Sequence, residues 1–242
     1  PFAISKINSS DSVLILIGKQ SIGYFDMQGF MLKGVTPLNF NIVSVGMKNH
    51  VPLLFDDRGR MHSVEGVNKI AAPVKVPNGI RGQVTAYANS TKSSLEAYGT
   101  KEGIIFVYDV KKGSLLPQLT GHESKITRLR MNNRRLYSSS LDGKLNLWII
   151  NDNEREKIEP LTLIKINEWM MNFNFDRTKD RVWTGGQNGT ITKSLISIDR
   201  MKNKLLNEIL KRDLTVEEWN YYIGTDVPWK SFLKERGKEG RK

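Results

Sequence analysis

The stretch LTGHESKITRLRMNNRRLYSSSLDGKLNLWII, from Leu119 to Ile150, decides the fold predicted for this chain of 242 residues. It contains a Gly-His pair, an alternating apolar run, a run of serines, an Asp-Gly pair and a last run that includes Trp148. An Asp-Gly pair between two alternating runs favours a tight β-hairpin, because its glycine adopts the positive φ that the turn requires. The stretch therefore predicts short antiparallel strands joined by tight turns.

The same pattern recurs along the whole chain. Copies of the run that ends at Trp148 lie at intervals of roughly 40 residues. They end at Phe25, Val64, Tyr108 and Ser194, and two of them have their hairpin turns at Glu102-Gly103 and Asn188-Gly189. A period in the low forties with four short strands per unit is typical of the blades of a β-propeller.

Each unit reads as an outer strand followed by the three inner strands of the next blade. The outer strands are expected at residues 30–32, 73–76, 115–119 and 161–166, and the first inner strands at 40–45, 84–88, 126–131 and 169–175. The prediction is an all-β propeller of four-stranded antiparallel blades over residues 1–198. The approximate unit bounds are 1–27, 28–67, 68–112, 113–152 and 153–198.

The two ends of the repeat region predict an incomplete ring. The first inner strand begins at Phe2 without an outer strand before it, and no outer strand is expected after Ile198. Exposed sheet edges are a liability, so propellers usually close by pairing their terminal strands within one blade. We expect about two further blades upstream in a longer parent chain, with a compact five-blade ring as the alternative.

The period changes after Ser197, where helical patterns begin. Asp199 can cap a helix that runs to Leu210, and Thr215-Val-Glu-Glu matches a capping box for a second helix that Gly224 ends. Residues 199–242 are therefore expected to form a short helical extension with a basic tail.

The composition limits the possible functions. The sequence has no cysteine, which excludes disulfides and thiolate chemistry, and no apolar run approaches the roughly 20 residues of a membrane span. A net charge of +12 is compatible with an anionic partner such as nucleic acid, or with solubility alone. The chain begins with Pro1 and has no secretory pattern, so it is expected to be part of a cytoplasmic protein.

The repeats resemble the WD-repeat β-propeller family. The fourth unit carries the resemblance best, with Gly121-His122, the Ser138 run, Asp142-Gly143 and Trp148. Residues 213–224, followed by Pro228, resemble the helical tail of bacterial WD-repeat proteins, in which signalling or effector domains often precede the propeller. The resemblance implies the C-terminal part of a bacterial multidomain protein.

The resemblance also implies a role for four residues of the fourth unit. In the family, the matching side chains form a hydrogen-bonded chain from Trp148 through Ser138 and His122 to Asp142. A catalytic Ser-His-Asp set is the alternative, but no G-x-S-x-G motif accompanies these residues. The other units have Thr184, Tyr98, Leu54 and Ile15 at the position of Ser138, so those blades are expected to rely on apolar packing.

No metal or cofactor site is predicted. The three histidines, His50, His62 and His122, fall in different units and lack ligand spacing. The Asp56-Asp57 pair precedes a turn but is not followed by a cation-loop pattern, so a surface turn is expected there.

Basic residues are expected on both faces of the propeller. The second face is formed by the loops that precede each first strand and those that join the second strand to the third, and it carries Lys19, Arg58, Lys101 and Lys125. The first face is formed by the remaining loops and carries Lys48, Lys92, Arg134, Arg135, Arg177, Lys179 and Arg181.

Propellers are mostly platforms, and the sequence predicts a non-enzymatic scaffold or sensor that binds a protein or peptide partner through its second face. The alternative is a nucleic-acid-binding propeller that uses the first face to bind anions. An enzyme ranks third, because no set of catalytic carboxylates or histidines is evident.

Overall fold

The structure is a computed structural model. It describes residues 3–6, 13–26, 29, 31–49, 51–66, 69–151, 157–197, 200–201 and 215–222. The chain divides into two compact units, one formed by residues 1–176 with 182–194 and the other by residues 177–181 with 195–242. The sheets described next belong almost entirely to the first unit.

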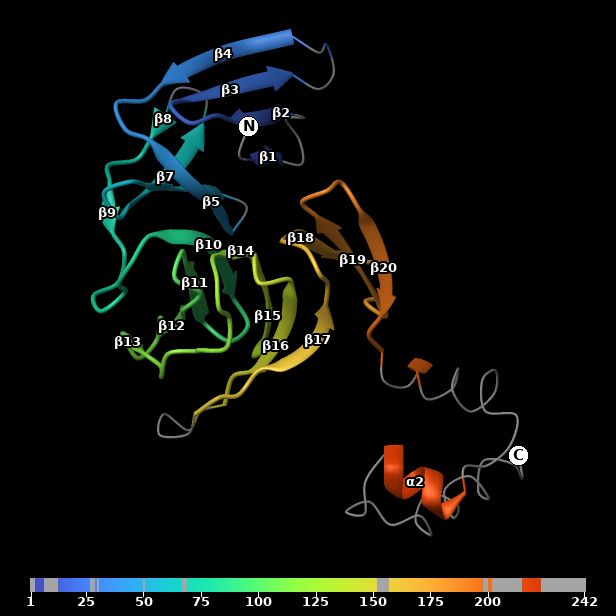
Figure 1. The fold of residues 1–242 in the computed structure, drawn as a ribbon. Helices are drawn as coiled ribbons and strands as arrows, with labels where there is room; N and C mark the ends of the chain where they lie inside the picture. The colour runs from blue at the N-terminus through green and yellow to red at the C-terminus, as the bar shows by residue number, and fades with distance from the viewer. Residues whose placement is uncertain are drawn as a thin grey trace. The chain divides into compact units, whose positions relative to one another are not determined.

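Five antiparallel sheets follow one another along the chain (Figure 1). The first contains β1 (Ala3–Lys6), β2 (Val13–Ile17), β3 (Ser21–Asp26) and β4 (Met31–Pro37). The second contains β5 (Ile42–Lys48), β6 (Val51–Asp56), β7 (Arg60–Gly66), β8 (Lys69–Ile70) and β9 (Val74–Lys75). The third contains β10 (Val84–Ser90), β11 (Leu95–Thr100), β12 (Ile105–Asp109) and β13 (Ser114–Leu115).

The fourth sheet contains β14 (Ile126–Asn132), β15 (Arg135–Ser140), β16 (Lys144–Ile149) and β17 (Leu161–Lys165). The fifth contains β18 (Met170–Phe175), β19 (Arg181–Gly186) and β20 (Ile191–Leu195). Strands adjacent in the chain pair in order, except that β9 pairs with β7 in the second sheet, and this order is the pattern of propeller blades. The all-β prediction is confirmed.

Four of the sheets share one hairpin turn between their second and third strands. Its glycine has a positive φ of 73° to 84° and donates its N–H to the carbonyl three residues earlier, at 3.1–3.3 Å. The glycines are Gly59, Gly103, Gly143 and Gly189. Asp-Gly, Glu-Gly and Asn-Gly pairs thus form the turns predicted for them, because glycine adopts this conformation without steric cost.

The outer strand β17 lies at the predicted residues, whereas two other outer strands differ from their predicted positions. The strand expected at residues 115–119 is reduced to β13 and a single bridge between Ile105 and Leu119. The strand expected at residues 73–76 is split in two, since β8 and β9 both pair with β7. Each of these two segments contains a proline, Pro117 or Pro73, which cannot donate a ladder hydrogen bond.

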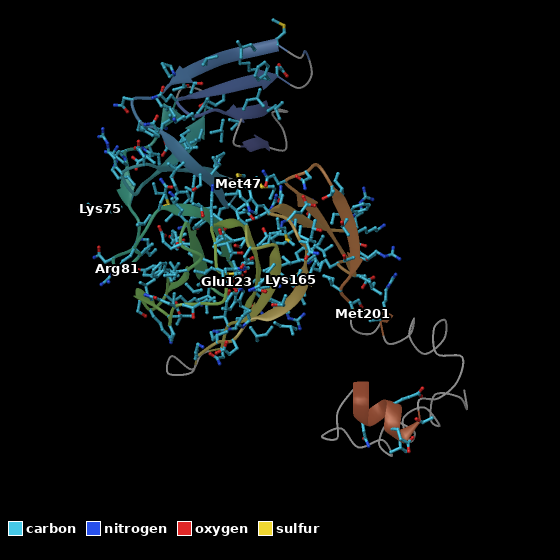
Figure 2. The ribbon with its side chains drawn as sticks, in the orientation of Figure 1. Met47, Lys75, Arg81, Glu123, Lys165 and Met201 are labelled. Carbon is cyan, nitrogen blue, oxygen red and sulfur yellow. The ribbon has the colours of Figure 1, made fainter. Side chains whose placement is uncertain are left out.

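Neighbouring sheets pack through buried apolar clusters. Ile17 and Tyr24 of the first sheet join Ile42 and Leu54 of the second, and Ala97 and Ile105 of the third join Leu129 and Trp148 of the fourth. The first strands β5, β10, β14 and β18 lie beside one another in that order (Figure 1). Met47 on β5 lies among these strands, and Lys75 on β9 lies at the outer side of its sheet (Figure 2).

The second unit contains α2 (Val216–Tyr222). Its first turn has the predicted capping box, in which Thr215 N–H donates to Glu218 Oε2 at 2.9 Å and Glu218 N–H donates to Thr215 Oγ1 at 3.2 Å. These bonds satisfy N–H groups that a helix start leaves unpaired. The helix predicted for residues 199–210 lies outside the described residues, apart from Arg200 and Met201, which are helical.

Candidate functional sites

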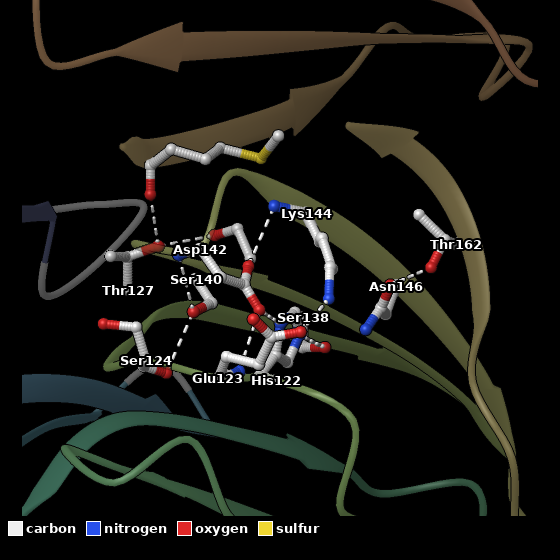
Figure 3. Close-up of polar contacts among 12 residues, drawn as sticks. His122, Glu123, Ser124, Thr127, Ser138, Ser140, Asp142, Lys144, Asn146 and Thr162 are labelled. Carbon is white, nitrogen blue, oxygen red and sulfur yellow. Dashed lines mark hydrogen bonds and ion pairs between the residues drawn. The ribbon is translucent and has the colours of Figure 1, made fainter. Parts of the chain in front are cut away.

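A chain of hydrogen bonds runs through the fourth sheet (Figure 3). Trp148 Nε1 lies 2.7 Å from Ser138 Oγ, which lies 2.7 Å from His122 Nε2. His122 Nδ1 lies 2.9 Å from Asp142 Oδ2. Ser138 comes from β15, Trp148 from β16, and the other two from the loops beside them, so the chain of bonds ties three segments together.

The chemistry of the groups gives these bonds a direction. An indole N–H only donates, and an ionised carboxylate only accepts. Ser138 therefore accepts from Trp148 and donates to Nε2 of His122, which leaves Nδ1–H to donate to Asp142. Every group in the chain then has a partner, as buried polar groups require.

Asp142 is held as a carboxylate. Burial alone raises the pKa of Asp142, but hydrogen bonds from His122 and from the backbone N–H groups of Lys144 and Glu123 outweigh it and lower that pKa to about 2. The carboxylate thereby caps the hairpin turn and anchors the imidazole at the same time.

The atoms of Ser138, His122 and Asp142 pair as they do in a catalytic triad, but the site is closed. Ser138 has no exposed surface, and its hydroxyl is enclosed by Trp148 and His122. A nucleophile needs access to substrate and a base that can take up its proton. The geometry therefore favours the structural role over the catalytic alternative.

The expectation that the other blades rely on apolar packing is wrong for the second sheet. Asp56, which is fully buried rather than part of a surface turn, accepts a bond from His62 Nε2 at 3.0 Å and one from Arg60 Nε at 2.7 Å. His62 in turn stacks on Phe40, with ring centroids 3.9 Å apart. The alternation of residues 56, 60 and 62 across a hairpin was the available signal for this group, since such positions share one face of a sheet.

The third sheet also contains a buried polar group. Tyr98 donates to Glu96, and Lys48 of the second sheet forms an ion pair with Glu96 at 2.5 Å. Burial and the adjacent Glu96 raise the pKa of Tyr98, so it stays a neutral donor. The position of Ser138 is thus occupied here by a tyrosine with its own partner, whereas the hydroxyl of Thr184, in the fifth sheet, has none among the described residues.

Loops of the second face are joined by backbone bonds. The residue after the second strand donates its N–H to the carbonyl just before the first strand in four sheets, at 3.0–3.1 Å. The pairs are Asp57 with Asn41, Lys101 with Gln83, Leu141 with Lys125, and Gln187 with Trp169. Lys19 O accepts from Ile42 N at 2.8 Å, which links the first sheet to the second on the same face.

The four predicted cations of the second face have no partner for their charged groups among the described residues. Lys19, Arg58 and Lys101 are exposed, and Lys125 is half-buried. The backbone bonds fix the loops that carry these residues, and their charged groups remain available to a ligand.

The cations of the first face are less uniform. Lys48 is engaged by Glu96, and Arg134 approaches the carbonyl of Ile150 at 3.5 Å. Lys92 lines a hollow of about 360 Å³ together with four asparagines, and Arg135 is exposed. Arg177, Lys179 and Arg181 belong to the second compact unit.

No histidine forms a metal site in the described part of the chain, where no group of three potential ligands occurs. His62 and His122 each bond a single carboxylate instead. His50 lies outside the described residues.

Comparison with known structures addresses the fold. The chain is similar to the structure of U3-55K, with 14% identity and a TM-score of 0.61 over 81% of this chain and 62% of that one. It is similar to the same degree to the WD40 repeats of RRP9, over 81% and 61% of the two chains. The chain has the fold of a WD-repeat β-propeller. This propeller is also similar to the computationally designed protein Ika8, with 21% identity and a TM-score of 0.55 over 80% and 58% of the chains.

Sequence comparison gives distant relatives of the propeller. It is 26% identical over 128 residues to the Periodic tryptophan protein 2 homolog of Caenorhabditis elegans, which is 51% of this chain and 13% of that protein. It is 26% identical over 167 residues to Protein DSE1 of Scheffersomyces stipitis, which is 60% of this chain and 24% of that protein. No family model matches the sequence.

The propeller therefore corresponds to a small part of each curated relative. Both organisms are eukaryotes, so these relatives lend no support to the expected bacterial origin or to upstream signalling domains. In the portion of the chain that the structure describes, no helix has the length and hydropathy needed to cross a bilayer.

Proposed function

We propose that this propeller is a non-enzymatic scaffold that binds a protein or peptide partner through its second face. The observation that carries the proposal is the set of four cations on that face, Lys19, Arg58, Lys101 and Lys125, whose charged groups have no partner among the described residues. Rigid loops with unpaired charges favour selective binding, because little ordering is required on association.

The finer features of the proposal rest on the sequence alone. They are a place within a longer polypeptide, a sensor role and a cytoplasmic location. The sequence also predicts a bacterial signalling or defence setting, to which the two eukaryotic relatives lend no support.

The test compares two variants of the propeller. In one, Lys19, Lys101 and Lys125 are replaced by alanine. In the other, the first-face residues Lys92 and Arg135 are replaced. Proteins cross-linked to the wild-type chain in cells are identified, and the strongest is purified and titrated against all three forms.

We expect a complex that is weakened at least tenfold by the second-face substitutions and is unaffected by the first-face substitutions. Binding that depends only on the first-face residues would contradict the proposal.

A nucleic-acid-binding propeller is the second candidate. It is supported by the first-face hollow, where Lys92 lies among Asn49, Asn89, Asn132 and Asn133, since amides can bond base edges. No aromatic side chain lines that hollow for base stacking. Retention on single-stranded RNA that falls steeply with salt and is lost on replacing Lys92 and Arg135 would favour this candidate.

A further inference from the structure

A cavity of about 580 Å³ opens between the first and second sheets. Four segments line it: the connection between β4 and β5, the turn before β7, β7 itself, and the segment between β8 and β9. The lining residues are Pro37, Leu38, Asn39, Phe40, Arg58, Arg60, His62, Ile70, Ala71, Ala72 and Pro73. Arg58 belongs to the second face, so the cavity adjoins the surface proposed above for a partner.

The interrupted outer strand provides one wall of the cavity. β8 pairs with Val64 and Gly66, and β9 pairs with Arg60 and Met61. Residues 71–73 between them leave the ladder, with one backbone bond from Ala71 N to Ser63 O at 2.9 Å. In the fourth sheet, by contrast, the outer strand β17 is continuous. The break replaces a strand by small and cyclic side chains that face open space.

A buried carboxylate orders the polar side of the cavity. Asp56 has no exposed side-chain surface and holds Arg60 through Nε and His62 through Nε2 on the same oxygen. Its other oxygen accepts the backbone N–H groups of Arg58 and Arg60, at 3.0 and 2.8 Å. Asp56 therefore fixes the turn and two of the basic side chains before any ligand arrives.

The donors that remain at the cavity exceed the acceptors. Arg60 uses Nε for Asp56 and keeps 32% of its side chain exposed, so its terminal nitrogens stay available. The guanidinium of Arg58 has no hydrogen bond or ion pair within the described residues. No carboxylate lines the cavity, since Asp56 lies behind Arg60 and Asp57 accepts a bond from Asn41.

The remaining walls favour a peptide over a nucleotide. Base binding needs an open aromatic face, and the two rings at the cavity, Phe40 and His62, are 8% and 4% exposed and stacked on each other. Leu38, Ile70 and the two prolines instead offer apolar surface of the kind that holds aliphatic side chains.

We propose that this cavity binds an extended partner peptide by an anionic side chain, a carboxylate or a phosphate, which Arg58 and Arg60 receive. An apolar residue next to the anion would pack against the wall formed by Leu38 and Ile70. This inference rests on the proposed function, because it assigns the partner's chemistry at the second face. Guanidinium groups bind both carboxylates and phosphates in bidentate geometry. The experiment below distinguishes which of the two anions is bound.

The experiment uses the full chain and four peptide libraries with degenerate flanks. The fixed central residue is glutamate, phosphoserine, serine or glutamine. Binding is measured by fluorescence anisotropy for the wild type, for Arg58→Ala and for Ala72→Glu, which places a negative charge on the cavity wall. Arg135→Ala is the matched control, because Arg135 is an exposed arginine of the first face and does not line the cavity.

We expect a library with an anionic centre to bind at least tenfold more tightly than its neutral counterpart. Arg58→Ala and Ala72→Glu should each reduce this preference by about tenfold or more, and Arg135→Ala should leave it unchanged. The preferred anion, glutamate or phosphoserine, identifies the source of the charge. All three substituted positions are exposed, and melting curves verify that each variant is folded.

Equal binding of charged and neutral libraries, or equal loss in Arg135→Ala, would overturn the cavity proposal. Tighter binding of a single-stranded RNA oligonucleotide that Arg58→Ala abolishes would overturn it as well. A partner that depends on Lys101 and not on Arg58 would leave the proposed function standing and remove this inference alone.

Discussion

Ser138 is a buried hydroxyl whose two hydrogen bonds decide what it contributes. It has no exposed surface, so it would carry a desolvation cost if its partners were lost. Trp148 supplies one bond and a large apolar area, and His122 supplies the other. Ser138 therefore stabilises the fold only when the chain of hydrogen bonds is complete. That chain fixes how β15 and β16 lie against the loop that contains His122.

Trp148→Phe tests this dependence. The substitution keeps an aromatic ring but removes the indole N–H and leaves Ser138 short of a donor. We expect the free energy of unfolding to fall by about 1–3 kcal/mol, with no selective loss of partner binding. Urea denaturation followed by circular dichroism measures the change.

Trp169→Phe is the matched control, because Trp169 is 51% exposed. A surface substitution of this kind should change the free energy of unfolding by no more than about 0.5 kcal/mol. If Trp148→Phe were no more destabilising than this control, the hydrogen-bonded chain would have no structural role.

The polar groups of the second and third sheets were not predicted from the sequence. The four residues of the fourth sheet followed a family pattern, and the structure places them together. Asp56 and His62 follow no such pattern, although their spacing across a hairpin places them on one face. The ion pair of Lys48 with Glu96 joins two sheets, and no local spacing could have indicated it.

The first strands share a bulge and a hydroxyl hydrogen bond that joins each sheet to the next. β5, β10, β14 and β18 all have a register shift after their first residue, which is the signature of a β-bulge. Hydroxyl groups at or beside the bulge donate to the first strand of the following sheet. The bonds run from Ser44 to Val84 O at 2.7 Å, from Thr85 to Ile126 O at 2.7 Å and from Thr127 to Met170 O at 2.8 Å.

These acceptors are equivalent carbonyls, which indicates that the hydroxyls set the stagger between neighbouring first strands. Thr85→Val and Thr127→Val remove the donors with little change of shape. Each should lower the free energy of unfolding by about 1–2 kcal/mol. The double variant should depart from additivity, because the Ile126 carbonyl that accepts from Thr85 is bonded to the backbone nitrogen of Thr127.

Chemical denaturation checks this prediction, with Thr192→Val on the exposed strand β20 as the control. Losses no larger than that of the control would show that apolar packing alone joins the sheets.

Inner strands, hairpins and the outer strand β17 were predictable, whereas the outer strands of the second and third sheets were not. The second and third inner strands are joined by turns that contain Gly59, Gly103, Gly143 or Gly189, so strand periodicity and turn chemistry indicate the same bounds. Outer strands such as β4 expose Met31, Leu32 and Val35 and have no such constraint. The split into β8 and β9, which forms one wall of the cavity, follows from tertiary pairing to β7 and leaves no local signal.

At the scale of the whole molecule, the fold is built from one repeated unit, and the candidate sites lie where the units differ from one another. Four turns of one geometry hold the second face in place, and similar turns carry different cations. The buried carboxylates Asp56 and Asp142 stabilise two of these turns in different ways, one through an arginine and a histidine and the other through a histidine. Both carboxylates must stay ionised for the turns to hold, which ties global stability to pH.

Acid should therefore unfold the protein through these groups. Folding lowers the pKa of Asp142 from 3.8 to about 2, which contributes about 2 kcal/mol at neutral pH. Since the folded pKa is the lower one, this contribution is present above about pH 4 and is lost as the pH falls toward about 2. The pKa of Asp56 is also lowered, because bonds from His62 and Arg60 outweigh the effect of burial. Asp56 therefore also contributes to the fall in the free energy of unfolding at acid pH.

Urea titrations at a series of pH values measure this dependence in the wild type and in Asp142→Asn. The variant should be less stable at neutral pH and should lose about 2 kcal/mol less between pH 4 and pH 2, with a residual slope from Asp56. Glu159→Gln, which removes an exposed carboxylate paired with Lys157, should keep the wild-type slope. An unchanged slope in Asp142→Asn would mean that the carboxylate does not couple folding to protons, and the hydrogen bonds drawn to it would then be too weak to hold the turn.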